Sequence, residues 1–119
     1  AALAIDDTIP IPLPDEAMKA TIENGKIVDV SKTILPAKTN GDAIGAYKFS
    51  GKSLKVLINE LDNLVSNSVT KQLFTHAVKN ILNKVDIFSV STEGRSWIEI
   101  DDQNDLNMAQ SLIKKILEN

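Results

Sequence analysis

Apolar and polar residues alternate with a period of two near the start of the chain and again between residues 18 and 30. Leu3 to Ile5 predicts a first strand, and residues 18–22 and 26–30 predict two more, separated by Asn24-Gly25. Asn-Gly is the preferred sequence of a type I′ turn, because both central residues need positive φ. Residues 18–30 therefore predict a β-hairpin.

Three stretches have helical spacing of apolar residues instead. They run from about residue 54 to 65, from about Val69 to 82 with Ser68 as the N-cap, and from about 106 to 117. The residues expected to face inward are Leu54, Leu57, Ile58, Leu61, Leu64 and Val65 in the first, Leu73, Phe74, Ala77, Val78, Ile81 and Leu82 in the second, and Leu106, Ala109, Leu112, Ile113, Ile116 and Leu117 in the third.

Further strand-like stretches occur at residues 43–49, 85–90 and 96–100. Three of the four prolines fall at alternate positions within residues 9–14, which predicts an extended connection with few hydrogen-bond donors. Strands and helices interleave along the chain, so the predicted class is α/β with a mixed sheet that includes antiparallel hairpins.

Composition narrows the possible functions. The 119 residues carry a net charge of -3, so there is no basic excess to bind nucleic acid or an anionic membrane. The chain has no cysteine, which excludes a thiolate zinc site and a cysteine nucleophile and fits a reducing compartment. No apolar run reaches the length of about 20 residues that a membrane helix needs. A cytoplasmic location is the default expectation.

The densest group of polar residues lies between Trp97 and Asp105. On a strand, Trp97, Glu99 and Asp101 would share one face, and ligands of open α/β sheets bind just beyond strand ends. Asp102 and Asp105 fit the N-cap and the acidic position of a capping box. Asp101 is not needed for the cap, which leaves two interpretations open: a metal ligand or a solvated strand end.

Other candidate residues have weaker signals. His76, the only histidine, has no ligand or nucleophile near it in sequence, so a surface or boundary position is the simpler interpretation. Lys32 follows the hairpin and can meet a substrate phosphate as a point charge, although a solvated lysine is the alternative. No Walker-type or Rossmann glycine pattern occurs, since Gly41 and Gly45 alone make no phosphate loop.

The order of the segments resembles the nucleotidyltransferase family, most closely its phosphocholine and 2-aminoethylphosphonate cytidylyltransferases. Such enzymes carry a methionine-lysine strand, a hairpin ending in lysine, a glycine-acid-x-isoleucine-glycine segment ending in phenylalanine-serine, and a final tryptophan-x-glutamate-isoleucine-aspartate. Here the matching segments are Met18-Lys19, residues 24–32, residues 40–50 and residues 97–102. They occur in the same order and span most of the chain.

This resemblance implies a Rossmann-like α/β mixed sheet with a β-hairpin excursion, of which residues 1–119 would be the carboxyl-terminal half. The implied reaction transfers a nucleotidyl group from CTP to a small phosphate or phosphonate acceptor and releases pyrophosphate, with Mg²⁺ neutralising the phosphates. It further implies that Asp101 binds the metal and that Lys32 meets the acceptor's phosphate. Trp97 and Glu99 are expected to flank a cationic amine of the acceptor.

The sequence departs from this family in two places. Asp42 stands where glutamate is more common, and its shorter side chain argues against a direct substrate contact. The glycine-rich nucleotide loop and the early metal-binding aspartate belong to a region upstream of the one that Ala1 resembles, so we expect an amino-terminal nucleotide-binding half as a partner, and a homodimer is possible. Without that half, we expect the chain to be unstable as a monomer. The alternatives are a sugar-phosphate nucleotidyltransferase using UTP or dTTP and a non-catalytic binding or assembly module.

Overall fold

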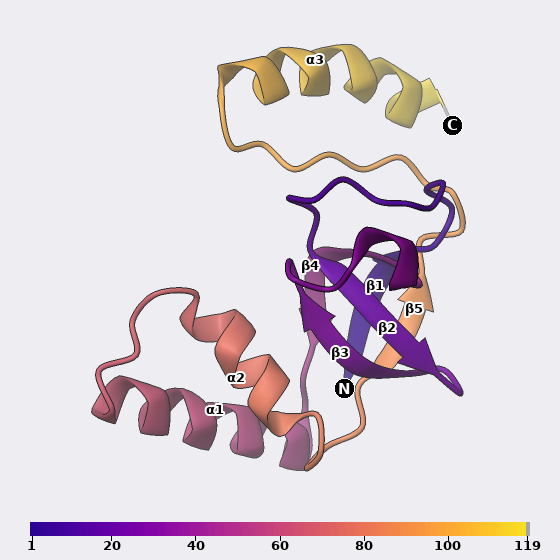
Figure 1. The fold of residues 1–119 in the computed structure, drawn as a ribbon. Helices are drawn as coiled ribbons and strands as arrows, with labels where there is room; N and C mark the ends of the chain where they lie inside the picture. The colour runs from indigo at the N-terminus through magenta and orange to yellow at the C-terminus, as the bar shows by residue number, and fades with distance from the viewer. Residues whose placement is uncertain (119) are drawn as a thin grey trace.

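Five short strands form the centre of the protein in the computed structural model, which describes residues 1–118. They close into a barrel in the order β1-β4-β2-β3-β5, in which β1 pairs with β5 in parallel and the other pairs are antiparallel (Figure 1). The strands are β1 (Ala2–Asp6), β2 (Lys19–Glu23), β3 (Lys26–Ser31), β4 (Gly41–Lys48) and β5 (Phe88–Ser91), and a single 3₁₀ turn, η1 (Pro36–Lys38), precedes β4.

The barrel shows that the predicted Rossmann-like open sheet is wrong. Closure depends on the contact between β3 and β5, where the Ile27 amide donates to the Ile87 carbonyl at 2.8 Å and Lys26 pairs with Phe88. Periodicity identifies strands from local residues, but it does not say which strand edges meet. Interleaved strands and helices are therefore compatible with both an open sheet and this barrel.

The predicted hairpin is confirmed. Asn24 and Gly25 both have positive φ, 51° and 77°, as the turn between β2 and β3 requires. One face of these strands lines the apolar core of the barrel, which comprises Leu3, Ile5, Ala20, Ile27, Val30, Ala43, Val78 and Ile87. The strand predicted at Leu3 to Ile5 is β1, one of the most buried elements.

Two helices, α1 (Gly51–Ser66) and α2 (Leu73–Ile81), pack together beside the barrel. α2 connects the barrel to α1. Its Val78 belongs to the barrel core, while its Ala77 and Ile81 pack against α1, at Leu57 and Leu64. The first turn of α2 comes later than predicted. Ser68 and Gln72 are left-handed, with φ of 61° and 51°, so Ser68 is not its N-cap and Gln72 takes that position.

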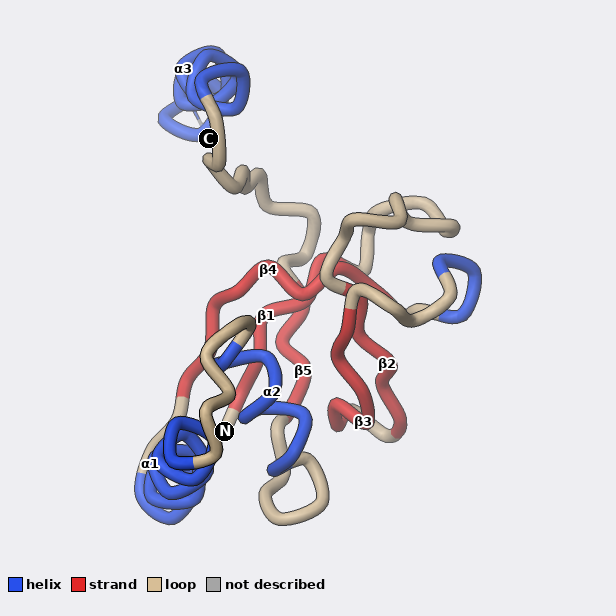
Figure 2. The backbone as a smooth tube through the Cα atoms, turned by 60° about the vertical axis from the view of Figure 1, so that its left-hand side comes forward, coloured by secondary structure: helices blue, strands red, loops and turns tan. Residues whose placement is uncertain are grey.

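The carboxyl-terminal part differs from the prediction more strongly. Residues 96–100 form no strand, and α3 (Gln103–Glu118) buries none of its residues. In both views, α3 lies apart from the barrel, on the opposite side from α1 and α2 (Figures 1 and 2). Its cap is as predicted, since the Asp105 amide donates to Asp102 Oδ1 at 2.9 Å. Among the described residues, no helix is both long and apolar enough to cross a membrane.

Candidate functional site: an acidic cleft at one end of the barrel

A row of polar residues crosses the barrel at one end. Asp6 of β1 lies opposite Asp42 of β4, Asp42 lies opposite Lys19 of β2, and Lys19 lies opposite Ser31 of β3. Side chains in register on neighbouring strands lie on the same face of the sheet. Because Asp6, Lys19 and Ser31 are buried, this end of the barrel has a polar interior, in contrast to the apolar core.

Lys19 holds the rim of this barrel end in place. Its side chain is fully buried, and its Nζ donates to the carbonyls of Asp15 at 2.7 Å, Ala17 at 3.1 Å and Lys32 at 2.7 Å. Three acceptors match the three protons of an ammonium group, which offsets the cost of burying the charge. Lys19 therefore joins the loop before β2 to the residue that follows β3, and so fixes the backbone of Lys32.

A cleft of about 530 Å³ opens at this end of the barrel. It brings together three of the residues that the sequence singled out: Lys32 after β3, and Glu99 and Asp101 from the segment before α3. Four carboxylates and one ammonium group line the cleft, so the net charge of its lining is negative. These charged residues are Glu16, Lys32, Asp42, Glu99 and Asp101.

The surroundings clearly alter the ionisation of Asp42 in this cleft. Burial raises the pKa of Asp42 to about 6, with further contributions from the negative charges of Asp6 and Glu99, against an opposing effect of Lys19. A cation that enters the cleft would replace this repulsion by attraction and favour the ionised carboxylate. The sequence argued against a direct contact by Asp42, but the fold places it on the cleft wall. The glycine-acid segment was the only sequence signal for it.

Trp97 is not among the residues that line the cleft. Its indole Nε1 donates to Asp6 Oδ2 at 2.6 Å, while Asp6 Oδ1 accepts from the amide and hydroxyl of Thr8 at 3.0 and 2.6 Å. Burial acts to raise the pKa of Asp6, but the hydrogen bonds from Thr8 and Trp97 outweigh it and lower the pKa below 3.8. Trp97 thus fastens the segment that carries Glu99 and Asp101 to a buried carboxylate of the barrel.

The same segment is held at its other end by α3. The backbone amide of Asp101 donates to Asp105 Oδ2 at 3.0 Å, so the Asp105 side chain caps the residue before the N-cap rather than Asp102 itself. Asp105 is therefore occupied in capping, whereas the carboxylate of Asp101 is exposed at the cleft. This arrangement separates the structural acids at the start of the helix from the acid that lines the cleft.

The carboxylates of the cleft suit a hard cation, because Mg²⁺ prefers oxygen ligands. Within residues 1–118, no three side chains of His, Cys, Asp or Glu converge into a complete metal-binding group. Magnesium commonly takes only one or two carboxylates and completes its coordination with substrate phosphates and water. The donor set here would therefore suit magnesium only in that form, with Asp101 as the candidate protein ligand.

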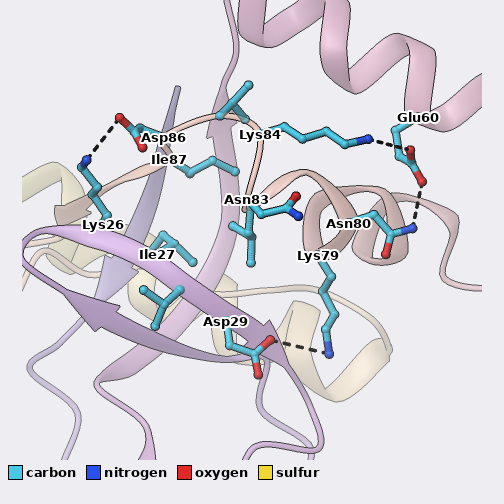
Figure 3. A pocket seen from close by; sticks show the side chains of 13 residues that line it. Lys26, Ile27, Asp29, Glu60, Lys79, Asn80, Asn83, Lys84, Asp86 and Ile87 are labelled. Atoms are coloured by element: carbon cyan, nitrogen blue, oxygen red, sulfur yellow. Dashed lines mark hydrogen bonds and ion pairs between the residues drawn. The ribbon is translucent and has the colours of Figure 1, made fainter.

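Another cleft, of about 740 Å³, lies between β3 and α2 (Figure 3). Its lysines are matched by acids: Lys26 with Asp86 at 3.2 Å, Lys79 with Asp29 at 3.6 Å, and Lys84 with Glu60 at 4.0 Å. Asn80 also donates to Glu60 at 2.8 Å, which ties α2 to α1. Since three lysines and three carboxylates line it, this cleft carries no net charge, unlike the acidic cleft.

No protein-family model matches this chain, and no curated protein sequence matches it either. The geometry of the clefts is therefore the basis for assigning a function.

Proposed function

We propose that the acidic cleft binds the acceptor of a nucleotidyl transfer reaction, a small phosphate or phosphonate compound that carries a cationic amine. The observation that carries the proposal is the meeting of Lys32 with Glu99 and Asp101 in one cleft, although they come from distant parts of the chain. The sequence resemblance suggested Lys32 and Asp101, and the face shared with Trp97 on a predicted strand suggested Glu99. CTP is the expected nucleotide donor.

The lining of the cleft suits both ends of such a ligand. A cationic head would be attracted by the carboxylates and by the aromatic rings of Tyr47 and Phe74, which meet edge to face with centroids 5.1 Å apart. The ammonium group of Lys32 would pair with the phosphate or phosphonate group. A sugar phosphate has an anionic group but no cation, and four carboxylates would disfavour it.

In the proposed reaction, an oxygen of the acceptor's phosphate or phosphonate attacks the α-phosphorus of CTP, and pyrophosphate leaves. Lys32 orients the acceptor's anionic group, while Glu99 and Asp42 hold its cationic head, so that the attacking oxygen is positioned before the bond forms. Magnesium, when bound at Asp101, would neutralise charge on the reacting phosphates. The groups that bind the nucleotide's base and remaining phosphates are expected from a separate nucleotide-binding part.

The first test is binding of phosphocholine, measured by isothermal titration calorimetry with and without Mg²⁺. We expect saturable binding that weakens about tenfold in Lys32→Met and in Glu99→Gln, because each substitution removes one charge interaction of about 1.4 kcal/mol. Asp86→Asn is the matched control, since it removes an exposed carboxylate outside the cleft. Equal affinity in all variants would contradict the proposal.

The second test is CTP-dependent release of pyrophosphate with phosphocholine, 2-aminoethylphosphonate and glucose 1-phosphate as acceptors. Turnover with the amine-bearing acceptors, lost in Asp101→Asn, supports the proposal. Turnover with glucose 1-phosphate and UTP alone would indicate a sugar-phosphate enzyme instead. Binding of phosphocholine without turnover, even with the nucleotide-binding part supplied, would indicate a non-catalytic binding module.

A further inference from the structure

A second cleft, of about 320 Å³, adjoins the acidic one. The two clefts share Met18, Lys32 and Thr75, so Lys32 lies on their common boundary. The other residues of the second cleft come from the end of β3 and from one side of α2. They are Ser31, Thr33, Gln72, His76, Lys79 and Asn80.

The chemical character of this cleft is opposite to that of its neighbour. Its lining holds two lysines, a histidine, three hydroxyl groups and two side-chain amides, and it includes no carboxylate. All of these groups can donate hydrogen bonds, and the lysines are cationic. The electrostatic character therefore changes from negative to positive across Lys32.

The β3 side of this cleft is well ordered by local hydrogen bonds. Ser31 is buried, its hydroxyl lies 2.7 Å from the hydroxyl of Thr33, and it accepts from the Thr33 amide at 3.0 Å. The residue between Ser31 and Thr33 is Lys32, and its carbonyl accepts a hydrogen bond from Lys19 Nζ at 2.7 Å. Three consecutive residues are thus fixed at the wall of the cleft before any ligand arrives.

The α2 side supplies charge that remains available to a ligand. Lys79 pairs with Asp29 at 3.6 Å, but both side chains are well exposed, at 38% and 44%. Exposed pairs of this kind contribute about 1 kcal/mol or less, so an anion in the cleft can compete for Lys79. His76 lies on the same side of α2, one helical turn or less from Lys79, and is exposed.

We propose that this second cleft is an anion subsite, in which Lys32, His76 and Lys79 bind the phosphate or phosphonate group of the ligand whose cationic head occupies the acidic cleft. The inference rests on the proposed function only for the identity of that ligand. A dipolar ligand would lie across the boundary in one orientation. Neither an amine alone nor a phosphate alone satisfies both clefts.

The test is an NMR titration of the full chain with three probes: sulfate, choline and phosphocholine. His76 is the only histidine, so its imidazole gives a single resolved signal inside the second cleft. We expect sulfate to move this signal and the amides of Thr33 and Lys79 saturably, and choline to move the amides of Glu99 and Asp101. Phosphocholine should move both sets and bind at least tenfold more tightly than either fragment, because its two groups are linked.

Variants separate the two clefts. His76→Gln and Lys79→Met should each weaken sulfate and phosphocholine about tenfold and leave choline unchanged. Lys84→Met is the control, since it removes an exposed lysine, shortly after α2, that lines the cleft between β3 and α2 but neither the acidic cleft nor the second cleft. Loss of phosphocholine binding in Lys84→Met to the same extent would overturn the inference.

The outcomes also distinguish this inference from the proposed function. If sulfate gives no saturable change at His76, or an unchanged affinity in both variants, the anion subsite is refuted. If sulfate binds as expected while choline and phosphocholine do not reach Glu99 and Asp101, the acceptor role of the acidic cleft is refuted and the second cleft is a site for free phosphate. Binding of all three probes with equal affinity would refute the proposal that phosphocholine lies across both clefts.

Discussion

The barrel and the carboxyl-terminal segment, residues 92–118, both contribute to the acidic cleft, but they are held in very different ways. The barrel wall carries Asp42 on a paired strand and Lys32 next to a fully buried lysine. The segment carries Glu99 and Asp101 on irregular backbone that is fastened by Trp97 and by the cap of α3. Regions with few buried apolar contacts open at lower free energy than cores do. One wall of the cleft is therefore rigid and the other is adjustable.

The helices show the same contrast. α1 and α3 are both 16-residue amphipathic helices, yet α1 buries Leu57 and Leu64 against α2, whereas α3 buries nothing. Isolated helices of this length are marginally stable in water. An apolar stripe therefore shows that a helix is able to pack, but a neighbour must be in place for that packing to contribute stability.

The largest expected difference in the free energy of unfolding is between Ile5→Ala in the barrel and Ile113→Ala in α3. Ile5 is 1% exposed in the barrel core, so its truncation should lower the free energy of unfolding by about 2–5 kcal/mol. Ile113 is 51% exposed, and its truncation should cost less than about 0.5 kcal/mol. Urea denaturation followed by circular dichroism measures both. Equal losses would show that α3 packs as tightly as the barrel.

Lys19→Met should lower the free energy of unfolding by about 2–3 kcal/mol, because it leaves the carbonyls of Asp15, Ala17 and Lys32 without their donor. It should also weaken phosphocholine binding, since Lys32 loses its backbone restraint. Lys48→Met, at an exposed position of β4, is the matched control. A Lys19→Met protein with unchanged stability and affinity would show that the rim does not depend on this ammonium group.

Trp97→Phe should act mainly on the adjustable wall. It removes the hydrogen bond to Asp6 and keeps most of the ring, for an expected loss of about 1–2 kcal/mol. Hydrogen exchange should accelerate at residues 96–102 and stay unchanged at β2 and β3. The contrasting result is a uniform acceleration across the barrel, which would mean that Trp97 supports the whole fold.

The smallest expected effect concerns pH. Because the pKa of Asp42 is raised to about 6 in the folded protein, the folded state binds more protons than the unfolded state between the ordinary value of 3.8 and that value. Asp42 should therefore reduce stability as pH rises through this window, by about 1 kcal/mol or less after allowing for its partial exposure to water. Asp42→Asn should remove this contribution, whereas Asp86→Asn should not. Stability curves between pH 4 and 7 that keep the wild-type slope in Asp42→Asn would refute the assignment.

The sequence by itself determined the features that depend on near neighbours. Asn24-Gly25 specified the hairpin because its turn needs positive φ, and Asp102 with Asp105 specified the start of α3 because the first amides of a helix need acceptors. The resemblance singled out Lys32 and Asp101, and the predicted strand face singled out Glu99. Lys19 and Asp42 lay in matching segments, but nothing local indicated that Lys19 is buried or that Asp42 lines a cleft.

Only the tertiary structure decided which distant parts meet. Closure of the barrel depends on β3 meeting β5, and the cleft depends on Trp97 reaching Asp6, 91 residues away in the chain. The failed strand at residues 96–100 has the same origin, since alternating residues form a strand only when another edge is free to pair with them. Local spacing fixes which secondary structure each segment is able to form. Which structure it adopts depends on the distant strand edges and buried charged groups with which it can pair.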